Sequence, residues 1–297
     1  MKVSICIPAY NQTAYLKKTL NSILDQDFID YEIIITDDTP DDSVKNLIDE
    51  FDFRGKLRYF KNQSTLGTPE NWNEAIRKAQ GQYIKIIHHD DFFTYYHSLK
   101  EFVRMLDENP DSGFAFSSSL NLDKDFQVVS QHSPTLGQLE HLKKSPDYLF
   151  FSAIIGAPSA TIYRNNLSLF FDNSLKWFVD MDFYIRILKI NGEFIYNEKP
   201  LISTVDSPLR VTHECLDDQK IQIKEMVIVL KKITSNGFND LKFARYLSYR
   251  MMSNGITSIG KLKRFINNIN HLPFILYLAL FFSKIYYYLF RNKTFSK

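Results

Sequence analysis

Short runs of β-branched and other apolar residues alternate with segments of helical period along residues 1–118, and this alternation limits the possible folds more than any other feature. It is typical of βαβ units, in which a helix connects two strands of a largely parallel sheet. We therefore expect an α/β fold with a mostly parallel sheet flanked by helices. The pattern predicts strands at 3–7, 32–36, 57–61, 83–88 and 113–117, and helices at 13–24, 42–50, 69–80 and 98–108.

The pattern changes after residue 118. Proline and glycine interrupt residues 120–175, as in segments whose loops form a second binding subsite. A helix is predicted from about Asp180 to Asn191, followed by a short strand at 193–196. Beyond Asp217 the chain has the pattern of helices. We therefore expect an α/β region with two halves and a C-terminal helical appendage.

The charge is distributed unevenly. The chain has 36 Lys and Arg against 34 Asp and Glu, but ten of these cations and none of the acids follow Asp240. Residues 1–240 thus hold 26 cations against 34 acids. A basic end on an acidic protein favours a separate, negatively charged partner for that end. Nucleic acid is not expected, because no recognised binding module accompanies the basic patch.

The two cysteines and the N-terminus indicate the compartment. Cys6 and Cys215 are far apart, without the spacing of a zinc site or a disulfide framework, which suits a reducing environment. The sequence from Met1 to Pro8 enters a strand pattern directly, without the apolar core of a signal peptide. We expect the protein to stay in the cytoplasm.

Polar segments follow three of the predicted strands. Ligands of an open parallel sheet bind at the carboxyl ends of its strands, so these segments are expected to share one edge. Their acidic residues repel one another unless a cation or hydrogen-bond donors compensate, and Mg²⁺ or Mn²⁺ prefers carboxylate and phosphate oxygens. Any one Asp-Asp pair alone is more often a turn or helix cap. The segments are Pro8-Ala9-Tyr10-Asn11, Asp37-Asp38 and His88-His89-Asp90-Asp91.

As an ordered set, these and neighbouring motifs resemble the family 2 inverting glycosyltransferases of the GT-A fold, which have a Rossmann-like sheet. The resemblance covers about residues 1–215. It implies a nucleotide-sugar-binding half at 1–118 and an acceptor half at 119–215, with 216–297 outside it. The motifs are Val3 to Asn11, Tyr31 to Asp38, Asn62 to Gly67, Asn71-Trp72-Asn73, Ala79 to Ile84 and His89-Asp90-Asp91.

The resemblance assigns the donor-binding residues. Pro8, Ala9 and Tyr10 match the loop that lies along the nucleoside, and Asp37 with Asp38 matches the acidic pair that hydrogen-bonds the base and ribose.

Two departures concern the diphosphate. Asn73 matches a polar position near it, but Trp72 stands where many members have Arg. The family's Asp-x-Asp metal motif falls on His88 to Asp90, so that His88 replaces the first Asp while Asp90 keeps the metal-binding position. His88 and Asp91 are then expected to contact the donor, and a neutral His can hydrogen-bond the ribose or phosphate. A structural role is at least as good an interpretation of His89, because neighbours on a strand face opposite ways.

The resemblance also places the catalytic base. Inversion needs a carboxylate that takes the proton of the acceptor hydroxyl. The family places this Asp in a Glu-Asp pair before a helix, six residues ahead of an Arg. Asp180 and Arg186 have that spacing, with Val179 in place of the Glu. Asp182 is the competitor, and a carboxylate that only stabilises the helix N-terminus is the alternative for both.

Residues 207–213 resemble the loop that closes over the donor in many members of the family. Arg210 and His213 could reach the diphosphate from this loop. A surface loop without a ligand role is the alternative.

The tail has a membrane-like composition. Residues 272–290 are apolar except for Ser283-Lys284, with basic residues on both sides. Pro273, Lys284 and three consecutive tyrosines at 286–288 suit a helix at an anionic lipid interface better than one that spans the membrane. A helix packed on the catalytic region is the alternative.

These features give one leading hypothesis and two rivals. The hypothesis is an inverting, divalent-cation-dependent glycosyltransferase on the inner face of the cell membrane. It would transfer a sugar from a nucleoside diphosphate, UDP being the first choice, to a lipid-linked saccharide in cell-surface polysaccharide synthesis. One rival is a non-catalytic, membrane-associated scaffold of the same fold. The other is an iron oxygenase with a His-x-Asp…His triad, which needs a jelly-roll fold.

Overall fold

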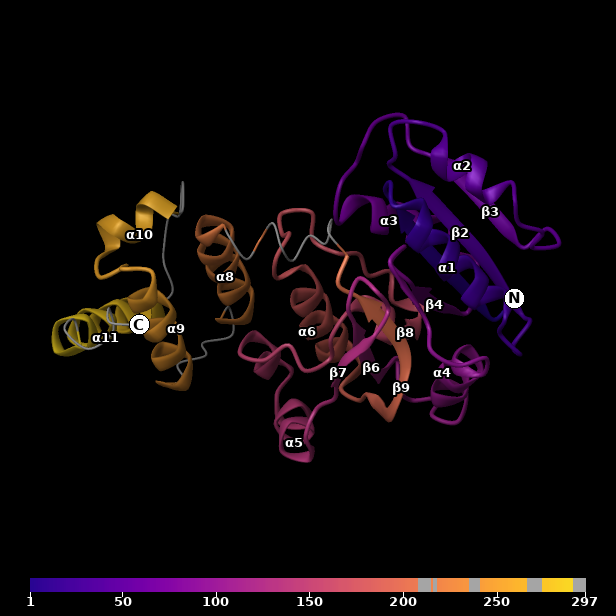
Figure 1. The fold of residues 1–297 in the computed structure, drawn as a ribbon. Helices are drawn as coiled ribbons and strands as arrows, with labels where there is room; N and C mark the ends of the chain where they lie inside the picture. Colours follow the sequence, from indigo (N-terminus) through magenta and orange to yellow (C-terminus); the bar gives the residue numbers. More distant parts are fainter. Residues whose placement is uncertain (208–214, 216–217, 235–240, 266–273, 291–297) are drawn as a thin grey trace. The chain divides into compact units, whose positions relative to one another are not determined.

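A computed structural model describes residues 1–207, 215, 218–234, 241–265 and 274–290 (Figure 1). The chain divides into two compact units. One comprises Met1–Leu175 and Val179–Arg210, and the other comprises Lys176–Phe178 and Val211–Lys297. The first unit contains the sheet. The described part of the second unit is helical.

The first unit alternates strands and helices through its N-terminal part. Its strands are β1 (Val3–Ala9), β2 (Tyr31–Asp37), β3 (Leu57–Lys61), β4 (Tyr83–Ile86), β5 (Asp91–Phe93), β6 (Phe114–Leu122), β7 (Val128–His132), β8 (Thr161–Arg164) and β9 (Ile195–Val205). Its α-helices are α1 (Thr13–Leu24), α2 (Ser43–Ile48), α3 (Glu70–Lys78), α4 (Ser98–Asp107), α5 (Leu136–Lys144) and α6 (Val179–Asn191). Short 3₁₀ turns lie at Pro146–Phe150, Pro158–Ala160 and Asn165–Leu167.

The strands form one sheet in the order β3-β2-β1-β4-β8-β6-β9-β5, with β7 paired to β6. The pairs β2–β3, β1–β2, β1–β4 and β6–β9 are parallel, and they include the longest ladders. The β4–β8, β6–β8, β6–β7 and β5–β9 pairs are antiparallel. The predicted α/β class with a mostly parallel sheet is therefore confirmed. The jelly-roll that the oxygenase rival requires is excluded.

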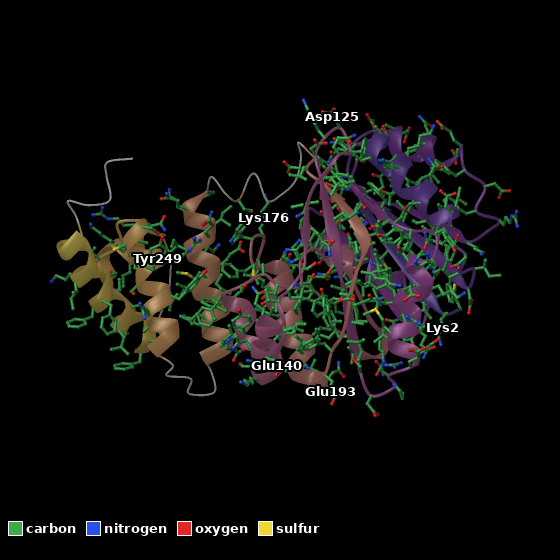
Figure 2. The ribbon with its side chains drawn as sticks, turned by 60° about the horizontal axis from the view of Figure 1, so that its bottom comes forward. Lys2, Asp125, Glu140, Lys176, Glu193 and Tyr249 are labelled. Atoms are coloured by element: carbon green, nitrogen blue, oxygen red, sulfur yellow. The ribbon has the colours of Figure 1, made fainter. Side chains whose placement is uncertain are left out.

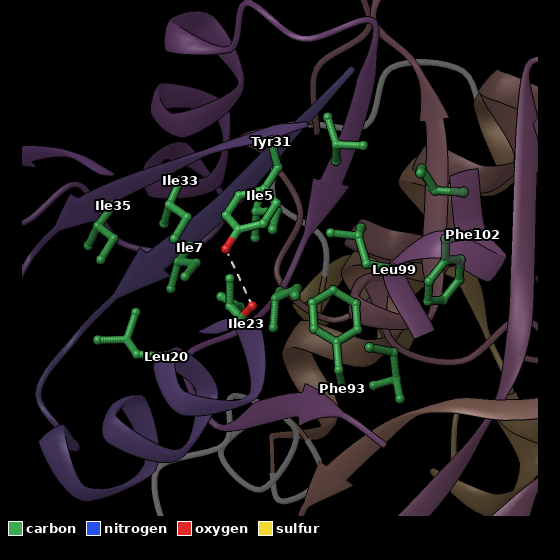
Figure 3. Close-up of a cluster of buried hydrophobic side chains, with 14 of the residues drawn as sticks. Ile5, Ile7, Leu20, Ile23, Tyr31, Ile33, Ile35, Phe93, Leu99 and Phe102 are labelled. Atoms are coloured by element: carbon green, nitrogen blue, oxygen red, sulfur yellow. Dashed lines mark hydrogen bonds between the residues drawn. The ribbon is translucent and has the colours of Figure 1, made fainter. Parts of the chain in front are cut away.

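A hydrophobic core lies between one face of the sheet and helices α1, α2 and α4. Alternate residues of β1 and β2 point into it, because neighbours on a strand face opposite sides. Figure 3 shows these side chains facing α1, where the Tyr31 hydroxyl donates a hydrogen bond to the Ile23 carbonyl at 3.4 Å. The core members labelled there are Ile5, Ile7, Leu20, Ile23, Tyr31, Ile33, Ile35, Phe93, Leu99 and Phe102.

The opposite face of β1 is joined to the segment after α3 by polar contacts. Ser4 Oγ accepts hydrogen bonds from the Gln80 and Gly81 amides and donates one to the buried Glu32 carboxylate at 2.7 Å. A Cβ atom on Gly81 would lie 2.6 Å from the Ser4 amide nitrogen, so the backbones approach too closely for any side chain. Helices thus flank both faces of the sheet, and the parallel pairing of β1 with β2 and β4 places their carboxyl ends at one edge.

Several predicted elements match, and others differ for identifiable reasons. Helix α1 and strand β3 have the predicted bounds, whereas β4 ends at Ile86, two residues early. Strands β6 and β9 are much longer than predicted, and β5, β7 and β8 were not predicted. The sequence pattern of a buried strand is interrupted in β6 by Ser117–Ser119. These serines are nevertheless buried, and Ser118 bonds to the Ser133 and Tyr196 hydroxyls at 2.8 and 2.7 Å.

The second unit contains α8 (Gln219–Thr234), α9 (Leu241–Ser253), α10 (Ile259–Phe265) and α11 (Phe274–Phe290). Helices α9 and α11 pack on each other. The buried side of α11 includes Leu276 and Ser283, whose hydroxyl donates to the Ile256 carbonyl at 2.8 Å. Among the described residues, no helix combines the length and the apolar character needed to cross a bilayer.

The core makes the unit's stability sensitive to truncation on α1. Leu20 is fully buried, so we expect Leu20→Ala to lower the free energy of unfolding by about 2 to 5 kcal/mol. Leu136→Ala is the matched control, since Leu136 is 83% exposed. Urea denaturation of the two variants would measure the difference. Equal unfolding midpoints would contradict the packing described here.

Candidate functional site

The loop after β1 is held in an unusual backbone conformation at the edge of the sheet. Asn11 and Gln12 have φ angles of 54° and 46°, in the left-handed region that residues other than glycine rarely occupy. The Asn11 amide donates to Thr39 Oγ1 at 2.8 Å, and the Ala9 carbonyl accepts from the Asp38 amide at 3.0 Å. Such strain persists only where the surroundings enforce it, and it is frequent at ligand sites.

Of the three predicted nucleoside contacts, Pro8 and Ala9 end β1 and are buried, and Tyr10 begins the loop and is 41% exposed. Because β1 lies between β2 and β4, the loop reaches both neighbouring strand ends. The ring of Tyr10 is therefore the part of this loop with the largest surface for a ligand.

His89 secures the same loop. Its Nδ1 lies 3.3 Å from the Pro8 carbonyl, and its Nε2 lies 3.0 Å from the Gln12 amide nitrogen. Because a carbonyl oxygen only accepts, Nδ1 carries the hydrogen and Nε2 accepts from Gln12. These contacts match the structural interpretation of His89. The strand-alternation argument does not apply, since β4 ends at Ile86 and His89 lies in a turn.

His88, Asp90 and Asp91 converge directly after β4. One ligand atom from each lies within 4.8 Å of the others, and the two carboxylates are buried. His88 Nδ1 is 3.8 Å from Asp91 Oδ2, and the His88 side chain is 20% exposed. The buried Ser207 hydroxyl, from the segment after β9, donates to Asp90 Oδ2 at 2.6 Å and orients that carboxylate. Two adjacent carboxylates and an imidazole are a donor set that fits a divalent cation.

A row of aromatic contacts leads from this cluster to α6. The Trp72 ring lies against the His88 ring, with centroids 4.6 Å apart, and meets Phe171 edge-on at 5.1 Å. Phe171 stacks on Phe183 of α6 at 4.1 Å. Two of the three departures from the family pattern, those at positions 72 and 88, are therefore in contact with each other.

Asp180 and Asp182 lie in the first turn of α6 and differ in their surroundings. Asp182 is buried and accepts a hydrogen bond from Arg186 Nε at 2.8 Å. Arg186 also donates to the Phe170 carbonyl at 2.8 Å, so this ion pair ties α6 to the preceding loop. Asp180 is half-buried. The geometry thus gives Asp182 a structural partner and leaves Asp180 with more solvent-accessible surface.

The segment before α6 is anchored within the second unit. The carboxylate of Glu225 on α8 accepts backbone hydrogen bonds from Lys176, Trp177 and Phe178 at 2.8, 2.6 and 2.9 Å. This contact was not predicted, because the partners are about 48 residues apart and share no periodic pattern.

Asp37 and Asp38 are buried and have several donors each. Asp37 accepts from the Thr39 amide, the Tyr59 hydroxyl and Lys61 Nζ at 2.8, 2.7 and 3.0 Å. Asp38 organises the following loop by accepting from the Asn62 side chain and from the amides of Leu66 and Gly67. The contacts predicted for this pair with the base and ribose stay a prediction.

Asn73 has a clear structural role. Its side chain pairs with both backbone groups of Phe171, accepting from the amide at 2.8 Å and donating to the carbonyl at 2.9 Å. It also donates to Asn173 Oδ1 at 3.0 Å. Its predicted place near the diphosphate is not tested. Arg210 and His213 lie outside the described residues.

A buried lysine, absent from the sequence predictions, lies beneath the cluster. Lys85 on β4 has no exposed surface, and its Nζ donates to the Ser159 carbonyl and faces the rings of Phe93 and Phe102. Burial lowers the pKa of the Lys85 ammonium well below its ordinary value, although the charge of Asp91 opposes this. Ser159 Oγ in turn accepts from the His88 amide at 3.0 Å. Lys85 thus supports the backbone that carries His88.

Comparison with known sequences identifies the family. Residues 4–168 match the sequence profile described as Glycosyl transferase family 2, more than half of the chain. The chain belongs to this family. The resemblance found in the sequence is therefore confirmed.

Individual relatives agree with this assignment. The chain is 28% identical over 204 residues to an uncharacterized glycosyltransferase of Methanocaldococcus jannaschii, covering 67% of this chain and 69% of that protein. It is 33% identical over 92 residues to a GalNAc(5)-diNAcBac-PP-undecaprenol β-1,3-glucosyltransferase of Campylobacter jejuni, covering 30% of each. The chain spans less than two thirds of the length of several curated relatives that it matches.

A solved structure supports the fold. The TarS fragment 1–349 of Staphylococcus aureus, in complex with UDP-GlcNAc, superposes with a TM-score of 0.69 at 17% identity. The match covers 100% of this chain and 93% of that one. The predicted GT-A fold is thus confirmed.

Lys85 makes stability depend on pH. The unfolded chain binds a proton at this position up to a pH of about 10.4, whereas the folded chain releases it at lower pH. Since the unfolded state then binds more protons, the free energy of unfolding should rise with pH between the two pKa values. Lys85→Met has no titratable group at this position, so this rise should be absent. The variant should have the higher free energy of unfolding at neutral pH, and its difference from the wild type should shrink as pH increases. Urea denaturation of the wild type and of Lys85→Met from pH 6 to 9.5 would measure the free energy of unfolding of each. Parallel curves of this free energy against pH would contradict the prediction.

Proposed function

We propose that this protein is an inverting glycosyltransferase that moves a sugar from a nucleoside diphosphate, UDP in the first instance, to a saccharide acceptor. The observation that carries the proposal is the convergence of His88, Asp90 and Asp91 at the carboxyl end of β4 in a family 2 chain. An edge of parallel strands is where such a sheet binds nucleotides.

The donor site is proposed around the loop after β1. Tyr10 lies along the nucleoside, with Pro8 and Ala9 shaping the backbone beneath it. Asp38, which is 4% exposed, makes the nucleoside contact of the acidic pair, because it is the member of the pair that keeps some exposed surface. Asp37, with no exposed surface, fixes the turn that presents Asp38. UDP-GlcNAc in the TarS structure supports the choice of a uridine nucleotide.

Asp90 is the proposed cation ligand, with Ser207 holding its carboxylate, and Asp91 and His88 stand beside it. A divalent cation bound there would offset the negative charge that develops on the departing diphosphate. As the family resemblance implies, Asn73 of α3 is proposed to lie near the diphosphate of the donor. Arg210 and His213 are proposed to contact the diphosphate from the closing loop.

Asp180 is the proposed base. Its carboxylate takes the proton of the acceptor hydroxyl while that oxygen forms a bond to the anomeric carbon and the bond to the diphosphate breaks. Attack from the face opposite the leaving group inverts the configuration. The position of Asp180 at a helix start, half-buried and distinct from the ion-paired Asp182, supports this assignment.

Two isosteric variants test the base. Asp180→Asn should lower turnover by roughly a hundredfold to ten-thousandfold, the usual contribution of general base catalysis, while donor binding is retained. Asp182→Asn is the matched control: it should weaken the pairing with Arg186 and lower stability, with a much smaller effect on turnover. The measurements are release of nucleoside diphosphate from a panel of nucleotide sugars, and thermal stabilisation by the donor.

Unaltered turnover in Asp180→Asn would refute the base assignment. Absence of nucleotide release by the wild type across the panel, with and without acceptor saccharides, would favour the scaffold alternative instead.

We further propose that the acceptor is lipid-linked and that the second unit rests on an anionic membrane surface, on the inner, cytoplasmic face of the cell membrane. One side of α11 is apolar and exposed: Phe274, Tyr277, Phe281 and Ile285 are 64, 45, 61 and 39% exposed. Tyr249 of α9, labelled in Figure 2, is 64% exposed. Because the cations beyond Asp240 have no acidic counterparts, anionic headgroups complement this region. The undecaprenol-linked substrate of the Campylobacter relative supports a lipid acceptor.

The double variant Phe274→Ser/Phe281→Ser tests this surface. Each Phe should contribute about 2 kcal/mol when it inserts among lipids, so binding should fall by more than tenfold. Co-sedimentation with phosphatidylcholine vesicles that do or do not contain phosphatidylglycerol would measure it, with Leu136→Ser as the control for an exposed apolar residue elsewhere. Equal binding of the double variant and the control would contradict the proposal.

A further inference from the structure

We infer that the cation site of this chain is a mixed imidazole and carboxylate site that favours first-row transition ions over Mg²⁺, and that Trp72 positions its histidine. The inference rests on the proposed function only in that it uses the same cation site. It concerns which ion binds and how the site selects it.

The three side chains have suitable spacing. Two ligands of one ion can be no further apart than twice the bond length, about 4.2 Å for bonds of about 2.1 Å. His88 Nδ1 and Asp91 Oδ2, at 3.8 Å, satisfy this limit. The ligand atoms of His88, Asp90 and Asp91 all lie within 4.8 Å of one another, so closure around an ion needs shifts of only some tenths of an ångström.

The surroundings hold each ligand in place. Asp90 is oriented by the Ser207 hydroxyl, and the His88 amide is fixed by Ser159 Oγ. The imidazole lies against the Trp72 ring, with an angle of 39° between the ring planes. Outer contacts of this kind set ligand orientation and commonly change metal affinity by about 10- to 100-fold. Trp72 therefore limits the rotation of His88, the most exposed of the three ligands.

An imidazole changes which ion is preferred. Mg²⁺ requires near-ideal octahedral oxygen coordination and loses its water reluctantly, so it gains little from a nitrogen ligand. First-row ions bind mixed nitrogen and oxygen sites more tightly, with affinity rising from Mn²⁺ to Co²⁺. The site should therefore bind Co²⁺ more tightly than Mn²⁺, and Mn²⁺ more tightly than Mg²⁺.

Trp72 is also the reporter for the experiment. The chain has two tryptophans, at 72 and 177, so Trp177→Phe leaves Trp72 as the single indole. Paramagnetic Mn²⁺ or Co²⁺ bound at His88 should quench its fluorescence across the short distance between the rings. In metal-free full-length protein, Mn²⁺ is titrated while the electron paramagnetic resonance signal of free Mn²⁺ is followed in parallel. Mg²⁺ and Co²⁺ are then measured by displacement of Mn²⁺.

Quenching of Trp72 fluorescence and uptake of Mn²⁺ should follow the same titration curve. Displacement of bound Mn²⁺ by Mg²⁺ should need a Mg²⁺ concentration at least about a hundredfold higher than that of Mn²⁺. In His88→Asp, the preference for Mn²⁺ over Mg²⁺ should fall by about tenfold or more. Trp72→Phe, followed by paramagnetic resonance, should reduce the preference when His88 is present and leave it unchanged in His88→Asp. A merely structural role of Trp72 would not give this dependence on His88.

Three results would overturn the inference: comparable wild-type affinities for Mn²⁺ and Mg²⁺, an unchanged preference in His88→Asp, or Mn²⁺ uptake without quenching of Trp72. Because the wild-type competition needs no variant at the site, poor folding of a variant does not remove the test. Nucleotide release is measured separately. A protein that has the predicted ion preference but releases no nucleotide would refute the proposed function and leave this inference standing.

Discussion

The repulsion among acidic side chains at one edge of the sheet is the constraint to which the rest of the site responds. Parallel pairing of β2, β1 and β4 brings the segments after these strands together, including Asp37, Asp38, Asp90 and Asp91, all buried. The first pair receives amide, hydroxyl and lysine donors from its own loop, from β3 and from the segment after β3. The second pair faces a histidine and a serine hydroxyl, with the buried Lys85 on the strand behind it. The chain thus stabilises one acidic pair internally and leaves the other suited to a cation.

Aromatic packing connects this edge to the helix that carries the proposed base. Trp72 lies between His88 and Phe171, and Phe171 stacks on Phe183. Asn73, the neighbour of Trp72, fixes the backbone of Phe171 from the same helix. Substitutions on α3 can therefore alter both the orientation of His88 and the loop that precedes α6, without contact with the substrate.

The sequence carried enough information for the first half of the fold and for the order of the motifs, because local periodicity and strand-end chemistry are visible in a single chain. It could not supply contacts between distant residues. Ser207 meets Asp90 across 117 positions, and the Trp72–His88 contact joins a helix to a strand end. Strand β6 escaped prediction beyond Ser117 because its serines have the composition of a loop, whereas in the structure Ser118 is buried and bonds to Ser133 and Tyr196 outside the strand. The lone Lys85 in an apolar strand was a visible sign of an unusual site that the sequence analysis did not use.

The departures at positions 72 and 88 bear directly on the choice between an enzyme and a scaffold. Contacting side chains must fit each other in a scaffold as well as in an enzyme, but only a cation site also needs ligand atoms within reach of one ion. Here the indole and the imidazole are in contact, the histidine keeps a place beside both carboxylates, and Ser207 still orients Asp90. An imidazole in place of a carboxylate also removes one negative charge from an already crowded edge, which lessens the need for a cationic neighbour at position 72. The two side chains that depart from the family pattern thus form one packed group beside both carboxylates, which is the arrangement that the proposed cation site needs.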